Sequence, residues 1–118
     1  MVFLTAVLKP GAKIPTHRHP GADEILFFQN GIASVTLANT VKDVHAGATV
    51  FIPADTWIGV SNTGKEPITL AGIFSAPGFE EFLRAETVPE GKKNVPISDA
   101  EDQAALKMHA HDVIYKQP

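Results

Sequence analysis

The sequence contains no cysteine, so it can form neither a disulfide nor a zinc-thiolate site. This absence fits a reducing compartment, and we expect a cytoplasmic protein. Positive charge is also scarce, because ten Lys and Arg residues face 13 Asp and Glu residues and leave a formal net charge of -3. A surface without an excess of basic residues does not attract a phosphate backbone, which argues against a nucleic-acid partner.

The chain also lacks any long apolar run. No segment approaches the roughly 18 to 20 apolar residues that a membrane-spanning helix needs, and we expect no membrane association. The apolar stretch Met1–Leu8 is short and has no basic residues ahead of it, which is untypical of a signal peptide and predicts a strand instead. A length of 118 residues is enough for one core, and we expect a single domain over 1–118.

What the sequence does contain is a series of short runs rich in Val, Ile, Phe and Thr, each ending at turn residues. Between two of these runs, Asn30-Gly31 predicts a type I′ hairpin, because both central residues of that turn need positive φ. Runs this short and regular indicate an antiparallel sandwich or barrel over about 2–76. The predicted strands are Val2–Leu8, Ile25–Gln29, Ile32–Leu37, Thr49–Ile52, Trp57–Ser61 and Ile68–Ser75.

The tail, about 77–118, has a different pattern. Phe79, Phe82 and Leu83 fall on one helical face, which predicts an amphipathic helix near 78–86. Ser98 and Glu101 form a capping box ahead of a second predicted helix over about 99–109. We therefore expect a β-barrel followed by two short helices.

The residues with the clearest chemistry lie between Gly11 and Gly31. His17 and His19 are two apart, so in a strand they project to the same face, while Arg18 between them points to solvent. A turn at Pro20-Gly21 lets Glu24 return toward both imidazoles from the next strand. Two imidazoles and one carboxylate form a facial ligand set that suits Fe(II), and also Mn, Ni or Zn, with open positions for water or substrate.

The spacing Gly11-x5-His17-x-His19-x4-Glu24-x6-Gly31 resembles the first motif of the cupin superfamily at every fixed position. Part of the second cupin motif follows, with Gly47, Pro53 and Asn62. The segment 74–82 is similar to one found in small bacterial cupins of the quercetin-dioxygenase-like group. The resemblance implies an all-β fold, a cupin antiparallel β-barrel of the jelly-roll type with short C-terminal helices. It also implies a homodimer.

The chain departs from the second motif at two positions. Asp55 stands where the family has glycine, a mild change because aspartate tolerates turn and left-handed conformations. Ile58 stands where the family has its fourth metal ligand, a histidine, and isoleucine cannot coordinate a metal. The resemblance therefore implies a three-ligand site in which one wall, at Trp57 and Ile58, is apolar.

Two functions follow from this resemblance. The first is a metal-dependent enzyme, dioxygenase-, isomerase- or lyase-like, in which His17, His19 and Glu24 hold a divalent metal and Glu24 also serves as the catalytic acid or base. The second is a metal-free cupin module that binds a small molecule without catalysis. Both place the ligand in the mouth of the barrel. The residues expected to contact it are Phe28, Trp57, Ile58 and Phe74.

Three further histidines are expected to have no role in this site. His45 precedes a turn and is predicted to be a solvated loop residue. His109 and His111 are two residues apart at a helix end, so they do not share a helical face. A histidine at that end of a helix also interacts favourably with the helix dipole.

Overall fold

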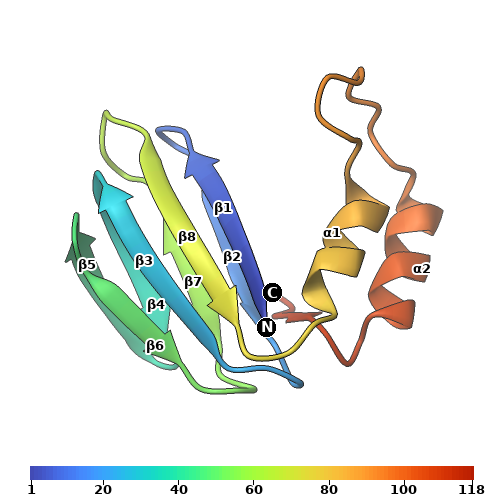
Figure 1. Cartoon of the computed structure of the whole chain (residues 1–118), viewed down its shortest axis with the longest axis horizontal. Coiled ribbons are helices and arrows are strands. Elements are labelled where there is room, and N and C mark those ends of the chain that lie inside the picture. Colours follow the sequence, from blue (N-terminus) through green and yellow to red (C-terminus); the bar gives the residue numbers. More distant parts are fainter.

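Residues 1–118 are described by a computed structural model in which the short apolar runs form two antiparallel sheets packed face to face (Figure 1). The first sheet has four strands in the order β1-β8-β3-β6, and the second has five in the order β5-β4-β7-β2-β9. The fold is thus mainly β, a jelly-roll sandwich with two short helices, as predicted. The strands of the first sheet are β1 (Val2–Leu8), β8 (Ile68–Phe74), β3 (Glu24–Asn30) and β6 (Thr49–Ile52). Those of the second are β5 (Thr40–His45), β4 (Ile32–Leu37), β7 (Ile58–Ser61), β2 (Lys13–Arg18) and β9 (Ile114–Tyr115).

Side-chain alternation along the strands places the core between the sheets. In β3, Glu24, Leu26 and Phe28 face inward and are buried, whereas Ile25 and Phe27 face outward and are exposed. Glu24 therefore enters the core because it lies in phase with two apolar residues. The other main members of this core are Ala33, Val35, Ile52, Ile58, Val60, Ile68 and Leu70.

The hairpin predicted at Asn30-Gly31 is wrong. β3 and β4 belong to different sheets, so Gly31 carries the chain across the sandwich, and only Gly31 of the pair has positive φ, at 83°. Asn30 stays in its strand, where its side-chain amide donates to the Pro67 carbonyl (3.0 Å) and accepts from the Thr69 amide (3.1 Å). These bonds to the loop before β8 and to β8 itself hold Asn30 against the first sheet, a long-range effect that local turn statistics do not contain.

Three strands lie outside the set predicted from the apolar runs. β5 forms a hairpin with β4 through a turn at Ala38 (φ 53°), and its mostly exposed, charged sequence hides the apolar pattern. β2 carries His17 but contains Pro15, which weakens the strand signal. β9 is two residues long and exists only because it pairs with β2.

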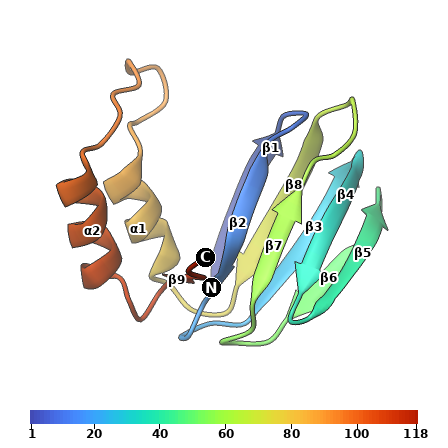
Figure 2. The ribbon, with the colours of Figure 1, turned by 180° about the vertical axis from the view of Figure 1, so that it is seen from behind.

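The two helices, α1 (Phe79–Glu86) and α2 (Asp99–Met108), agree with the predicted ones and lie beside the sandwich at its β1 and β2 side (Figures 1 and 2). Half of the predicted capping box is formed, since the Glu101 amide donates to the Ser98 hydroxyl oxygen (3.1 Å). The Glu101 carboxylate accepts from the Ser98 hydroxyl (3.0 Å) instead of the Ser98 backbone amide. Neither helix has the length and apolar character needed to cross a membrane.

Candidate metal centre and its cavity

His17, His19 and Glu24 converge where the first sheet meets the second. His17 lies near the end of β2, His19 follows directly after that strand, and Glu24 is the first residue of β3. One ligand atom from each lies within 4.8 Å of the others. The three residues are 6%, 3% and 6% exposed, so three side chains spread over eight sequence positions form one buried cluster.

Backbone carbonyls fix the tautomer of both histidines. His17 Nδ1 lies 2.7 Å from the Pro15 carbonyl oxygen, and His19 Nδ1 lies 2.8 Å from the Asp112 carbonyl oxygen. A carbonyl oxygen only accepts, so each Nδ1 must carry the proton and donate it. Each Nε2 is then left with a free lone pair, which is the state that a metal ligand requires.

Two of the buried polar atoms in the cluster have no hydrogen-bond partner. They are Nε2 of His19 and Oε1 of Glu24, which lie 3.7 Å apart. Buried polar atoms are nearly always satisfied, and an orphaned pair of a lone-pair nitrogen and a carboxylate oxygen has the chemistry of a cation site. The residues present therefore fit a divalent metal.

Burial sets the protonation of all three side chains. It lowers the pKa of His17 from its ordinary value and lowers the pKa of His19 to about 4. It raises the pKa of Glu24 to about 7. Both imidazoles are therefore neutral at physiological pH, whereas the ionised form of Glu24 is costly unless a cation lies beside it.

A cavity of about 250 Å³ opens beside His17 and Glu24 and runs between the two sheets. Of its 15 lining residues, 11 are hydrophobic. Two of the four predicted ligand contacts, Ile58 and Phe74, line it. The most apolar part of the wall is formed by Leu26, Ile58, Val60 and Leu70 from three strands.

The other two predicted contacts do not line this cavity. Phe28 is fully buried in the core between the sheets. Trp57 lies at the surface, where its ring meets the Arg18 guanidinium at 5.0 Å and the Lys116 ammonium at 5.8 Å. Arg18 also pairs with Asp55, so it faces away from the metal cluster as predicted.

Both departures from the second motif have a structural explanation. Asp55 has φ 61°, in the left-handed region that glycine occupies at least cost. Ile58 is paired with His17 in the register of β2 and β7, and it is 1% exposed. Isoleucine thus fills the position beside the cluster with hydrocarbon.

Phe79, Tyr115 and Asp112 contribute to the site but are absent from the predicted set. The ring of Phe79, at the start of α1, lies edge-on to His19 with centroids 4.5 Å apart, and the Tyr115 ring lies 5.6 Å from His17. The amphipathic pattern of α1 predicted that Phe79 packs on the barrel, but no local signal indicated which part of the barrel. Asp112, whose carbonyl oxygen contacts His19, lies 93 positions away from it in the sequence.

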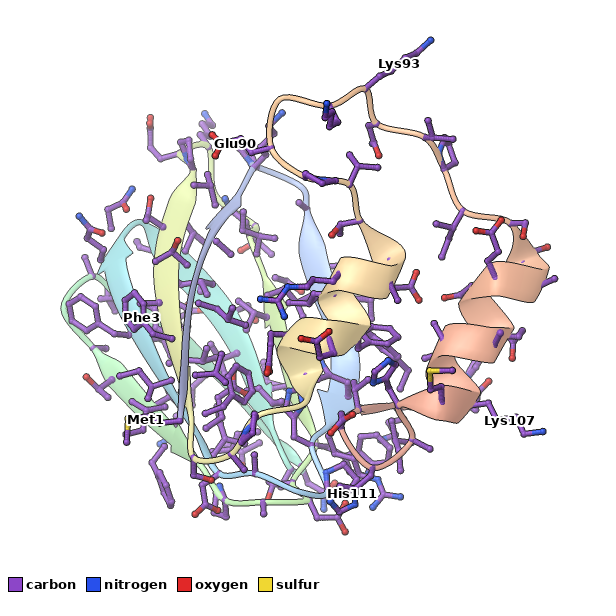
Figure 3. All side chains as sticks on the ribbon, turned by 45° about the vertical axis from the view of Figure 1, so that its right-hand side comes forward. Met1, Phe3, Glu90, Lys93, Lys107 and His111 are labelled. Carbon is purple, nitrogen blue, oxygen red and sulfur yellow. The ribbon has the colours of Figure 1, made fainter.

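The remaining histidines lie outside the cluster. His109 Nδ1 is 3.0 Å from the Asp112 carboxylate, and the His109 ring packs on Phe82. His111, labelled in Figure 3, is one of these histidines. It lies against Gly21, where an added Cβ would come within 2.7 Å of its Nε2. His45 is exposed at the end of β5.

Comparison with known proteins identifies a family for this sequence. The sequence profile described as "Cupin domain" matches residues 4–74. The chain is 30% identical over 73 residues to the uncharacterized protein YrkC of Bacillus subtilis (strain 168), which covers 57% of this chain and 39% of that protein. The chain therefore spans well under two thirds of the length of that relative.

Solved structures give the same architecture. One is a predicted oxalate decarboxylase from Thermotoga maritima, with a TM-score of 0.60 and 22% identity over 62% of this chain and 64% of that chain. Another is an oxalate oxidase in complex with the substrate analogue glycolate, with a TM-score of 0.59 and 27% identity over 63% of this chain and 41% of that chain. The first of these likenesses establishes the fold alone.

Proposed function

We propose that this chain, which belongs to the cupin domain family, is a metal-dependent enzyme acting on a small organic molecule at His17, His19 and Glu24. The observation that carries the proposal is the pair of orphaned buried atoms, His19 Nε2 and Glu24 Oε1, within a cluster whose histidine tautomers are already set. Such preorganisation keeps the cost of binding a metal low.

A bound divalent metal would supply Lewis acidity or a centre for dioxygen activation. His17 and His19 contribute neutral nitrogen ligands whose orientation is held by backbone carbonyls. Glu24 contributes the single negative charge and reaches the cavity, so its carboxyl can also exchange a proton with a molecule bound there. Ile58 and Phe74 exclude water from the part of the cavity in which substrate would lie beside the cluster.

Within this proposal we favour a dioxygenase-like reaction over an isomerase- or lyase-like one. Three protein ligands leave room for both substrate and dioxygen, which is the arrangement of non-haem iron oxygenases. A fourth histidine at position 58 would occupy part of that room. The similarity of segment 74–82 to the quercetin-dioxygenase-like group supports the same choice. Fe, Mn, Ni and Zn each accept two imidazoles and a carboxylate, but Zn has no redox chemistry and fits only the isomerase- or lyase-like alternative.

The apolar residue at position 58 favours a second candidate, a metal-free cupin that binds a small molecule. In that case 11 hydrophobic lining residues supply affinity, and His17 and Glu24 supply hydrogen bonds at one end of the cavity. The two candidates share one site and differ in whether the cluster holds a metal.

Metal titration of protein purified without an affinity tag tests the first candidate. We expect one equivalent of metal in the wild type, and none in His17→Ala or His19→Ala, because each variant removes one of three ligands. His45→Ala is the matched control, since His45 is an exposed histidine on β5, outside the cluster. Full occupancy in both cluster variants would place the metal elsewhere and contradict the proposal.

Ile58→His separates the two candidates. The substitution adds an imidazole beside His17 at a cost of roughly 1 to 3 kcal/mol of burial, partly recovered on coordination. Tight Mn(II), Ni(II) or Zn(II) binding by both proteins supports the three-ligand enzyme. Weak binding by the wild type with tight binding by the variant supports the metal-free module. Binding by neither protein would mean that the cluster does not act as a ligand set.

A further inference from the structure

The cavity beside the metal cluster is largely apolar. Besides His17, Glu24 and Tyr115, its walls come from Leu4, Ala6, Ile14 and the apolar residues of β3, β7 and β8. Thr5 also borders the cavity, but it alternates with Leu4 and Ala6, so its side chain points to the other face of β1 and the cavity meets its backbone. No Lys or Arg lines the cavity.

From this distribution we infer that the natural ligand is a largely apolar molecule with a single polar head, and that the site rejects dianions such as oxalate. The placement of the head on a metal rests on the proposed function. The preference for an apolar body rests on the cavity walls alone. By this inference the ligand of the chain differs in class from oxalate, which appears in the names of two proteins that share its fold, a predicted oxalate decarboxylase and an oxalate oxidase.

Charge counting gives the first reason. A divalent metal held by two neutral imidazoles and one carboxylate has a net charge of +1, which compensates one anionic donor. A dianion that binds the metal through both carboxylates would leave the site with a net charge of -1, next to Leu26, Ile58 and Leu70 and with no basic residue in the cavity to pair with it. Burying an unpaired charge costs several kcal/mol. The nearest basic residue in sequence, Arg18, cannot help because it pairs with Asp55 and stacks on Trp57 outside the barrel.

Size gives the second reason. An apolar cavity of about 150 Å³ holds a benzene molecule, so a cavity of about 250 Å³ accommodates a body of roughly ten non-hydrogen atoms. Oxalate would leave most of this volume unfilled. Phe79 and Leu83 of α1 close the side of the cavity that faces the helices, so the ligand must fit beneath this helix. A single ring with a short substituent satisfies both the volume and the polarity.

The test uses 4-ethylphenol and oxalate as probes on the Co(II)-loaded and the metal-free protein. Calorimetry measures both affinities, and the visible spectrum of Co(II) reports whether a head group enters the coordination sphere. We expect 4-ethylphenol to bind at least about tenfold more tightly than oxalate to the loaded protein. We expect it to bind the metal-free protein as well, because the apolar walls do not depend on the metal.

Two variants of α1 show whether the probe occupies this cavity. Leu83→Trp places a larger side chain into the cavity, and we expect it to weaken 4-ethylphenol binding at least about tenfold while Co(II) affinity stays unchanged. Ala85→Trp introduces the same residue on the exposed face of the same helix and should change neither. Oxalate binding as tightly as 4-ethylphenol, or equal probe affinity in both variants, would overturn the inference. Absent Co(II) binding with retained 4-ethylphenol binding would overturn the metal proposal and leave the cavity inference supported.

Discussion

His17 and His19 owe their availability as ligands to backbone atoms. The Pro15 carbonyl lies two residues from His17, so this hydrogen bond belongs to the local chain path through β2. The Asp112 carbonyl that holds His19 comes from the far end of the chain. The convergence of the three ligand residues could be predicted from sequence because their spacing and strand alternation are local. The bond that orients His19 could not, since nothing near His19 in sequence encodes it.

Glu24 leads to a prediction about the metal-free protein at residue scale. Burial raises its pKa in the folded state to about 7, above its ordinary value of 4.5, so the folded protein loses stability as pH rises from about 4.5 to about 7. At pH 8 a buried, unpaired carboxylate remains. Glu24→Gln removes that charge, and we expect the free energy of unfolding at pH 8 to rise by about 1 to 2 kcal/mol, after allowing for the buried amide.

Urea unfolding of both metal-free proteins between pH 4 and pH 8 measures this effect. The advantage of Glu24→Gln should shrink as pH falls and vanish below about pH 4.5, where Glu24 is protonated in both the folded and the unfolded state. The same variant should lose metal affinity, so that stability and metal binding change in opposite directions. A variant less stable than the wild type at pH 8 would show that Glu24 has a stabilising partner in the metal-free protein.

At the scale of elements, the helical tail completes the site. α1 brings Phe79 onto His19, and the segment after α2 brings Asp112 and Tyr115. A small second core, formed by Phe82, Ala105 and Val113, holds these two parts together. Periodicity and a capping box predicted both helices. Their docking position is set by this second core, which joins segments distant in sequence and is therefore invisible to local patterns.

Phe82 is the residue through which this docking can be tested. It is 3% exposed, lies 6.0 Å from Phe79 in a stacked arrangement and lies 6.1 Å from Tyr115 between ring centroids. We expect Phe82→Ala to lower the free energy of unfolding by about 3 to 5 kcal/mol. Because Val113 packs in the same core and follows Asp112, metal affinity should fall as well.

Met108→Ala provides the matched control for Phe82→Ala. Met108 ends α2 and is 80% exposed, so its truncation should change stability by no more than about 0.5 kcal/mol and leave metal affinity unchanged. Urea denaturation and metal titration under one buffer compare the variants. Equal metal affinity in the wild type and in a folded Phe82→Ala protein would show that the tail does not support His19.

At the scale of the whole molecule, the outer face of the first sheet is largely apolar, and its strands place no charged residue on it. Strand register aligns Phe3, Ile73, Ile25 and Phe51 in one row across all four strands, and Thr5, Ala71, Phe27 and Thr49 in the next. The exposed fractions of Phe3, Phe27 and Phe51 are 64%, 41% and 57%. Figure 3 places Phe3 pointing away from the helices, and Figures 1 and 2 show that neither helix covers this face.

The homodimer expected from sequence would use this face. A neutral surface pairs with a copy of itself without like-charge repulsion, even in a chain with a net charge of -3. Four strands spaced about 4.8 Å apart and roughly 20 Å long present on the order of 400 Å² in plan per copy. Side chains that protrude from the sheet add to this area, so the total surface buried by two copies approaches the roughly 1,000 Å² of a specific interface.

Sedimentation of the wild type at micromolar concentration should therefore give twice the chain mass of 12.6 kDa. Phe27→Lys places a charge near the middle of the face and, in a two-fold dimer, opposes two such charges, so we expect a monomer with an unchanged β-type circular dichroism spectrum. Val41→Lys is the matched control, because Val41 is 63% exposed on β5 of the other sheet, and this variant should remain dimeric. A wild-type mass of 12.6 kDa, or a dimer that persists in Phe27→Lys, would show that this face does not bind a second copy.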